Sequence, residues 1–574
     1  MAAMSVSLNN GERTVVLLFI SCVLFSLPLS LLYQGFALCL LTLAGLFVEV
    51  SAENSTSLSR FKTRPGASSG ILLGAVTLPA VMFSRLIQLS RAVASYDVGT
   101  EEVGYLNMQY WAVSASCFSV LVLLHLVSRH SSSNTGSSWL GSFQDRKFGI
   151  ICIPLYATVC CMSLATNSHG GFHVAMELLW VLSHGLAAVK LIQHILHTFP
   201  SCASIGEALL VTAGLVLYFG DMLAYTFGKI IAYSISSRLL SLQFGSKRSE
   251  IGTIIQGVLY GLLLFPILYK FILQIWAHFI SIDYSEACTA DERTSKGIGR
   301  SLLFYASLAV TLVVIVPTWM QFVQDFHVHP LSWVFTFVFM EPFKRLALCI
   351  YWIGVICLSV VRFYNISKNS KIERVLLRKY YHMVAVLMFV PAIIFEPNFL
   401  DLAFGVALAV FLALEIVRVW KIWPLWRTVH HFMNAFTDHR DSDLLIVSHF
   451  SLLLGCALPK WISTGFNDRP LAPLAGILSL GIGDTMASMV GHKYGVLRWS
   501  KTGKKTVEGT AAGITSVLAA CSVLLPLLAS TSYILSQHWI SLLLAVTVSG
   551  LLEAYTAQLD NAFIPLVFYS LLCL

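Results

Sequence analysis

Long apolar runs, separated by short polar segments, follow one another along the whole chain of 574 residues. Many of these runs are long enough, at 1.5 Å of helix rise per residue, to cross about 30 Å of hydrocarbon. A helix satisfies its backbone groups within one segment, and the alternating pattern of a membrane barrel is missing. The pattern predicts an all-α polytopic membrane protein with roughly 15–17 transmembrane helices in one bundle.

The predicted spans are apolar runs of differing length. They lie near residues 14–32, 34–50, 70–90, 108–127, 148–165, 172–195, 205–228, 253–279, 300–322, 331–361 (one span or two), 382–395, 399–417, 443–458, 471–491, 509–529, 539–556 and 562–574. The run at 14–32 is longer than a signal-peptide core, so it is taken as the first transmembrane helix.

The composition excludes several other classes of protein. Charged residues make up 11 % of the chain and hydrophobic residues 57 %, whereas soluble domains carry about 25 % charged residues. The same numbers exclude a disordered chain, which needs low hydrophobicity and high charge. The net charge of +8 resides in short connections between apolar runs, where it determines topology, so we expect no nucleic-acid partner.

Polar chemistry is unevenly distributed along the chain. Residues 1–360 form apolar spans with polar connections, and we expect an N-terminal membrane region that serves as a lipid groove or scaffold. Residues 361–574 hold nearly all the concentrated polar residues, and we expect a multi-span catalytic region there. Three basic segments of this region, at 368–379, 418–427 and 493–505, fall on one side of the predicted spans. The positive-inside rule places that side in the cytosol.

The segment 481–510 carries the most informative chemistry. Glycines such as Gly481, Gly483, Gly491 and Gly495 let a backbone approach a ligand closely, and exposed N–H groups at such a turn can bind phosphate oxygens. The following K-K-T-V-E-G-T run at 504–510 adds two lysines for a polyphosphate. No Walker A sequence is present. In the alternative interpretation, the glycines are helix-packing contacts and the lysines determine topology.

Carboxylates in the same region suit a divalent cation or a catalytic base. Asp484 and Glu508 are hard oxygen ligands of the kind Mg²⁺ prefers when it is bound to a polyphosphate. Glu553 and Asp560 are seven residues apart, so a continuous helix would place both on one face. Such a pair can bind a metal or act as a base, although a helix cap with a polar packing contact remains an alternative.

Several short motifs, in order and spacing, resemble the dolichol kinases, within a wider group of CTP-using polyprenol, phytol and diacylglycerol kinases. The resemblance covers roughly residues 375–574. The motifs are R-K-Y-Y-H at 378–382, I-F-E at 394–396, L-E-I-V-R at 414–418, F-T-D-H-R-D-S at 436–442, G-D-T-M-A-S at 483–488, K-K-T-V-E-G-T at 504–510 and L-E-A-Y-T-A-Q-L-D-N at 552–561. His439 departs from the acidic residue expected there, which puts an essential role for that position in doubt.

The resemblance implies an enzyme of the endoplasmic reticulum membrane with its active site facing the cytosol. It would transfer the γ-phosphate of CTP to the terminal hydroxyl of dolichol, giving dolichyl phosphate and CDP for the lipid carrier of protein glycosylation. A divalent cation, expected to be Mg²⁺, would assist.

The resemblance and the chemistry above also assign expected roles to individual residues. The catalytic carboxylates are expected to be Asp484, Glu508, Glu553 and Asp560, and the metal ligands Asp484 and Glu508. The nucleotide-binding residues are expected to be Gly481, Gly483, Asp484, Thr485, Ser488, Gly491, Lys493, Gly495, Lys504, Lys505, Thr506 and Gly509. Supporting roles are expected for Arg378, His382, Arg418, Asp438, Arg440, Asp441 and Asn561. Among the carboxylates, Asp560 is favoured over Asp484 as the group that orients or deprotonates the lipid hydroxyl.

Other functions stay open at this point. A CTP-dependent kinase of phytol or diacylglycerol would use the same chemistry, and a CDP-lipid synthase would also bind CTP but release pyrophosphate. A polytopic transporter would need charged residues along a path through the bilayer. Here the polar residues gather at one predicted face, as an interfacial enzyme requires.

Overall fold

The computed structural model describes the chain in twelve ranges. These are residues 2–53, 68–94, 100–133, 139–167, 171–199, 202–234, 248–281, 290–369, 374–434, 445–499, 505–530 and 539–574. Within them, every regular element is a helix, and a single isolated bridge joins Arg498 to Thr506. The predicted all-α class is therefore confirmed.

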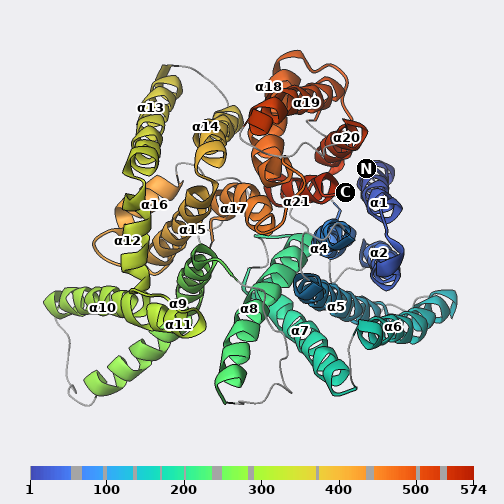
Figure 1. Ribbon diagram of the computed structural model, residues 1–574, viewed down its shortest axis with the longest axis horizontal. Coiled ribbons are helices and arrows are strands. Elements are labelled where there is room, and N and C mark those ends of the chain that lie inside the picture. Colours follow the sequence, from blue (N-terminus) through green and yellow to red (C-terminus); the bar gives the residue numbers. More distant parts are fainter. Residues whose placement is uncertain are drawn as a thin grey trace. The chain divides into compact units, whose positions relative to one another are not determined.

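The helices follow one another along the chain (Figure 1). Their bounds are α1 Ala2–Phe25, η1 Leu29–Leu31, α2 Leu32–Glu53, α4 Ile71–Ala94, α5 Thr100–Ser133, α6 Trp139–Asn167, α7 Gly171–Thr198, α8 Ile205–Ser234, α9 Glu250–Ser281, α10 Ala290–Val310, η3 Thr311–Ile315, α11 Val316–Val323, α12 Pro330–Met340, η4 Pro342–Leu346, α13 Ala347–Asn369, α14 Arg374–Phe395, α15 Pro397–Val419, α16 Trp426–Asn434, α17 Val447–Ile462, η5 Ala472–Leu474, η6 Ile477–Asp484, α18 Thr485–Tyr494, α19 Val507–Ser530, α20 Trp539–Tyr555 and α21 Asp560–Leu572.

Many of these helices have the length and composition of membrane spans. Among the described residues, 10 helices are long and apolar enough to cross a membrane, and six shorter apolar helices of 10–17 residues accompany them. The region predicted as one span or two at 331–361 divides into α12 and α13, separated by the π-helical turn η4. The predicted span 471–491 divides into η5, η6 and α18.

Packing groups the chain into two compact units. Unit 1 comprises residues 1–246, 362–390 and 454–574, and unit 2 comprises residues 247–361 and 391–453. The division expected at residue 360, between a lipid groove or scaffold and a catalytic region, concerns function and not packing. It stays a prediction. The carboxylates and glycines of the segment 481–510 all belong to unit 1.

An aromatic cluster forms a core of unit 2. The rings of Tyr269 and Phe304 meet edge to face with centroids 5.1 Å apart, and Phe265 stacks on Tyr269. Arg345 and Glu396 form a buried ion pair of 3.0 Å, which neutralises two charges near the start of α15. Such pairs satisfy charges that would be costly to bury alone.

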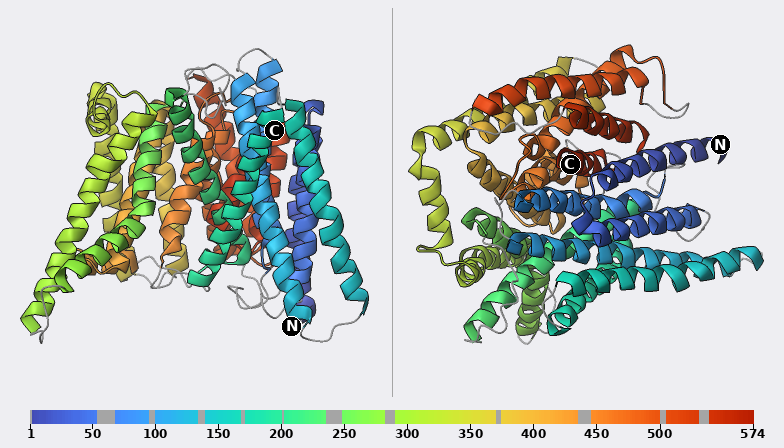
Figure 2. Two further views of the ribbon diagram at one scale, coloured as in Figure 1. Left: turned by 90° about the horizontal axis from the view of Figure 1, so that it is seen from below. Right: turned by 45° about the vertical axis from the view of Figure 1, so that its right-hand side comes forward.

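The centre of unit 1 is α4, whose apolar window is entirely buried. Its Ser84 hydroxyl lies 2.7 Å from that of Ser570 on α21, and the two helices lie side by side (Figure 1). At the other end of α4, the N–H of Gly206 donates to the carbonyl of Ser69 over 3.0 Å. Helices α2, α5, α6 and α7 pack alongside one another (Figure 2). The N-terminal helices thus pack directly onto the C-terminal α21 within one unit.

Candidate active site

Asp484 lies where the helix changes its winding. It is the last residue of the π-helical segment η6, and α18 begins at the next residue without a break. Wide π-helical turns inside α-helices are rare and are frequent at functional sites. The Asp484 side chain is only 3 % exposed, so its charge must be compensated by neighbouring groups.

Helix α14 supplies that compensation. Lys379 forms an ion pair with the Asp484 carboxylate, and His382 Nδ1 lies 3.1 Å from the same carboxylate oxygen. Lys379 and His382 are three residues apart, which places both on one face of α14. Their side chains are 13 % and 6 % exposed. The arrangement is a buried cluster of ionisable groups at a helix junction.

The segment around Asp484 is fixed on α14 by further contacts. The Thr485 hydroxyl donates to the Lys379 carbonyl over 3.3 Å. A Cβ at Gly481 would lie 3.3 Å from the His382 carbonyl oxygen and closer still to Val386. Gly481 and Thr485, both predicted to bind nucleotide, therefore face the protein itself.

The other glycines of the segment allow α18 and α19 to cross closely. A Cβ at Gly509 would lie 2.6 Å from the Ala487 carbonyl oxygen and 3.1 Å from the Cα of Gly491. A Cβ at Gly513 would lie 3.0 Å from the carbonyl oxygen of Gly483. Backbone this close excludes any side chain, so at these positions the structure explains glycine by helix packing.

The connection between α18 and α19 is held by its two ends. The Val507 N–H donates to the Leu497 carbonyl over 2.8 Å, and the Trp499 N–H donates to the Lys505 carbonyl over 3.2 Å. The Thr506 hydroxyl accepts from the Gly509 N–H over 3.2 Å and caps α19. The Glu508 carboxylate accepts from the Leu497 N–H at 3.0 and 3.2 Å. Glu508 thus secures this connection.

Lys505 joins this connection to the end of α20 and the start of α21. Its ammonium donates to the carbonyl of Glu553 and lies 3.3 Å from an Asp560 carboxylate oxygen. Burial alone would lower the pKa of Lys505, but the carboxylates of Asp560, Glu553 and Asp484 outweigh it and raise that pKa above its usual value. Lys505 is therefore a persistent cation among three carboxylates.

The four predicted catalytic carboxylates divide into three and one. Glu553 interacts electrostatically with Asp484, Asp560, Lys505 and Lys379. We call these five residues, together with His382, the charged cluster. Glu508 is held by Leu497, and no contact described in the structure joins it to Asp484. The predicted metal pair of Asp484 and Glu508 thus stays a prediction.

The remaining predicted residues lie in varied surroundings. Lys493 is exposed, with its ammonium 5.0 Å from the ring centre of Tyr494. Ser488 is half-buried on α18, Gly495 follows that helix, and Asn561 lies in the first turn of α21. Arg418 belongs to unit 2, where it pairs with Glu415 over 2.7 Å. Lys504, Asp438, Arg440 and Asp441 lie outside the described residues, and Arg378 is described only as part of the backbone of α14.

Two features of the site were missed by sequence reasoning. Lys379 was assigned only a topological role, although it lies three residues before His382, where a predicted span begins, and that spacing was a usable signal. Gln558, between α20 and α21, donates to the Ser68 carbonyl over 3.1 Å and accepts from the Ser204 hydroxyl. Nothing in the local sequence predicts this contact, because the partners are 490 and 354 residues away.

The carboxylates of the charged cluster fit a cation that is coordinated in part by substrate phosphates. Among the described residues, no group of three or more His, Cys, Asp or Glu side chains is placed to hold a metal ion. Mg²⁺ is usually held by one or two carboxylates together with substrate phosphates and water. Asp484 with Glu553 or Asp560 satisfies that smaller requirement.

Comparison with known proteins adds independent information. The family model described as dolichol kinase matches residues 171–453. The chain is 60 % identical to "Dolichol kinase EVAN" of Arabidopsis thaliana over 579 residues, which span the whole of both chains. It is 31 % identical to the dolichol kinase of Mus musculus over 493 residues, 79 % of this chain and 84 % of that protein. The dolichol kinase of Saccharomyces cerevisiae is 31 % identical over 41 % of this chain and 43 % of its own. No solved structure gives a significant match.

Proposed function

The chain belongs to the dolichol kinase family, and from this we propose that it transfers the γ-phosphate of CTP to the hydroxyl of dolichol. The products are dolichyl phosphate, which supplies the lipid carrier of protein glycosylation, and CDP. The observation that carries this proposal beyond the family name is the charged cluster. It combines two lysines with three carboxylates within unit 1.

Phosphoryl transfer needs in-line positioning and charge neutralisation more than covalent chemistry by the protein. In the proposed enzyme, Lys379 and Lys505 bind phosphate oxygens, and Lys504 would add a third cation. Asp484 and one of the other cluster carboxylates hold Mg²⁺. That ion would supply neutralisation of the developing negative charge on the phosphates.

The contacts around each carboxylate distinguish their proposed roles. Glu508 is engaged with the Leu497 N–H, whereas Glu553 and Asp560 share an electrostatic environment with Asp484. We therefore favour Glu553 or Asp560 over Glu508 as the second metal ligand. Gly481, Gly483 and Thr485 are engaged in packing, so we assign them the shaping of the backbone around Asp484.

The proposed location is the endoplasmic reticulum membrane, with the charged cluster facing the cytosol. The support is the charge pattern, since the three basic segments fall on one predicted side. CTP, dolichol and the bilayer are the proposed partners.

A kinase assay on detergent-purified protein tests the proposal. With γ-labelled CTP, dolichol and Mg²⁺, the wild type should label the lipid, and excess ATP should not compete. Asp484→Asn should abolish labelling, because it removes a charge that the two lysines and the metal require. Asp325→Asn, at an exposed aspartate of unit 2, is the matched control and should keep full activity.

Each other outcome has a definite meaning. Near-normal turnover by Asp484→Asn would reject the charged cluster as the active site. Transfer to phytol or diacylglycerol but not to dolichol would keep the chemistry and change the substrate. Competition by ATP would reject CTP as the specific donor.

A further inference from the structure

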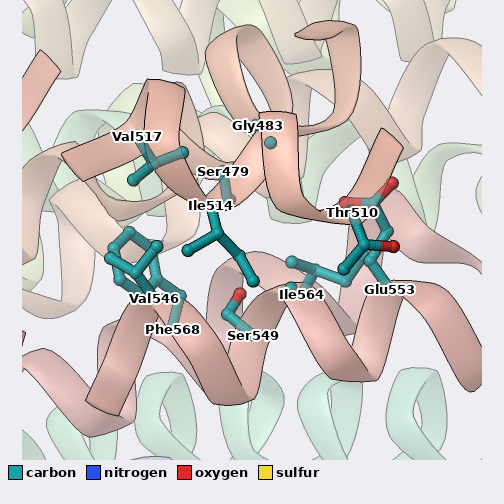
Figure 3. A pocket seen from close by; sticks show the side chains of 12 residues that line it. Ser479, Gly483, Thr510, Ile514, Val517, Val546, Ser549, Glu553, Ile564 and Phe568 are labelled. Atoms are coloured by element: carbon teal, nitrogen blue, oxygen red, sulfur yellow. The ribbon is translucent and has the colours of Figure 1, made fainter. Parts of the chain in front are cut away.

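The connection between α20 and α21 carries a group of the charged cluster at each end. Glu553 lies in the last turn of α20, with its side-chain oxygens beside Thr510 of α19 (Figure 3). Asp560 begins α21. Lys505 reaches both ends, since its ammonium donates to the Glu553 carbonyl and lies 3.3 Å from an Asp560 carboxylate oxygen. The path of residues 556–559 therefore determines whether one lysine can meet both groups at once.

Gln558 fixes that path from inside the protein. Its buried side chain is hydrogen-bonded at both amide atoms. The Nε2 group donates to the Ser68 carbonyl over 3.1 Å and lies 3.2 Å from the Ser68 hydroxyl, and Oε1 accepts from the Ser204 hydroxyl. A Cβ at Gly70, whose φ is +65°, would overlap this amide. The backbone before α4 thus encloses the Gln558 side chain and restricts its rotamer.

A second set of contacts holds the same connection from α1. The Glu12 carboxylate, buried on that helix, accepts from the Ser68 hydroxyl over 2.8 Å. It also accepts from the Thr556 hydroxyl and the Ala557 N–H. The Gln558 N–H in turn donates to the Thr556 hydroxyl over 3.1 Å. Four buried side chains from distant parts of unit 1 thus converge on this connection, and we call them the clamp: Glu12, Ser68, Ser204 and Gln558.

The clamp is made of hydrogen bonds, although apolar packing alone could join these helices. Apolar contacts are non-directional, whereas a hydrogen bond specifies both a distance and an angle. That precision matters beside reacting groups, which must be held to within about 0.5 Å of their productive geometry. A misplacement of about 1 Å can lower a rate about 100-fold. A polar clamp therefore suits a connection whose two ends must stay in register with one lysine.

We propose that Gln558 is a positioning residue for a lysine that binds phosphate. With the other members of the clamp, it holds the connection so that the ammonium of Lys505 lies between the Glu553 carbonyl and the Asp560 carboxylate. The inference rests on the proposed kinase function and adds to it a role for α1 and for the segments that precede α4 and α8. When the clamp loosens, Asp560 shifts relative to Lys505, and the ammonium leaves the place where it meets the nucleotide.

Steady-state kinetics of Gln558→Met test the clamp. Methionine has a similar length but lacks the amide, so the bonds to Ser68 and Ser204 are lost. The KM for CTP should rise at least fivefold and kcat should fall about 10-fold, while the KM for dolichol stays within twofold of the wild type. A smaller amount of folded protein would lower only the apparent kcat. The rise in the KM for CTP therefore separates positioning from stability.

Two serine variants provide a milder, matched comparison. Ser68→Ala removes the hydroxyl shared by the two sets of contacts, and it should raise the KM for CTP at least threefold. Ser84→Ala also removes a buried hydroxyl of unit 1. Its partner Ser570 lies about 15 Å along α21 from Asp560, at 1.5 Å per residue. Ser84→Ala should therefore leave both KM values and kcat as in the wild type.

Two results would overturn the inference. One is an unchanged KM for CTP in a folded Gln558→Met protein, or in Ser68→Ala if Gln558→Met does not fold. The other is an equal rise of that KM in Ser84→Ala, because any lost polar contact in unit 1 would then have the same effect. A wild type that phosphorylates no dolichol would instead overturn the proposed function itself, so the two failures are distinguishable.

Discussion

The charge of Asp484 is sustained by two neighbours on a single helix face. A buried carboxylate without a partner would be strongly destabilised, and removing one partner of a buried ion pair costs about 3–5 kcal/mol. Lys379 and His382 meet that requirement from α14. The same ion pair has a functional consequence, since a phosphate that attracts Lys379 would free Asp484 for a metal. We therefore infer that Lys379 alternates between the carboxylate and the nucleotide.

Substituting Lys379 with methionine tests this inference. Lys379→Met keeps the length of the side chain and removes its charge, so turnover should fall by about 100-fold or more, the usual loss for one preorganised donor. Lys344→Met, at an exposed lysine of unit 2, is the control and should retain activity. Steady-state rates with saturating CTP and dolichol provide the measurement.

The thermal stability of the variants separates this role from a purely structural one. Combining Lys379→Met with Asp484→Asn removes both buried charges, so the double variant should recover the thermal stability that Lys379→Met loses. Activity should stay absent. Activity near that of the wild type in the single Lys379→Met variant would contradict the inferred contact with the nucleotide.

Helices α18 and α19 are joined by glycines rather than by interlocking side chains. Glycine in a helix interior normally weakens it by about 0.5–1 kcal/mol relative to alanine. At this crossing the sign is reversed, because the neighbours of Gly509 are the backbone of Ala487 and Gly491. The close approach fixes Asp484 at the start of α18 and Thr506 at the cap of α19 relative to each other.

Gly509→Ala should therefore lower the melting temperature of the purified protein. Overpacking of this kind costs about 1–3 kcal/mol, because a backbone carbonyl 2.6 Å away cannot rotate aside. Gly354→Ala on α13 meets nothing within 4 Å and should leave the melting temperature unchanged or raise it. A melting temperature for Gly509→Ala at or above that of the wild type would reject close packing as the reason for glycine.

Hydrophobic patterning predicts helices well and their winding poorly. The predicted spans 205–228 and 539–556 correspond to α8 and α20, because helices this apolar are specified by composition. The π-helical turn at η6 was not predicted, since a pattern of apolar residues does not specify how a helix is wound. The glycines of 481–509 fitted both a phosphate loop and a helix crossing, and only the neighbours across the crossing distinguish the two.

At the scale of the molecule, residues far apart in the chain build unit 1 together. Gln558, beside the charged cluster, is held by Ser68 and Ser204, and the Ser68 hydroxyl also donates to Glu12 over 2.8 Å. The segment between α20 and α21 therefore depends on N-terminal helices for its polar contacts. Sequence reasoning assigned residues 1–360 no chemistry, because such long-range contacts leave no local pattern.

The positions of the basic segments predict the orientation of unit 1 in its membrane. If the positive-inside rule applies, the residues at the end of α18 face the cytosol and those after α17 face the lumen. Two exposed positions, Tyr494 and Thr464, are suited to single cysteine substitutions. In sealed microsomes, a membrane-impermeant maleimide should modify Tyr494→Cys directly and Thr464→Cys only after detergent is added, with the wild type giving the background from native cysteines. CTP drawn from the cytosol needs the charged cluster on that side, so the reverse labelling pattern would contradict both the orientation and the proposed access of CTP.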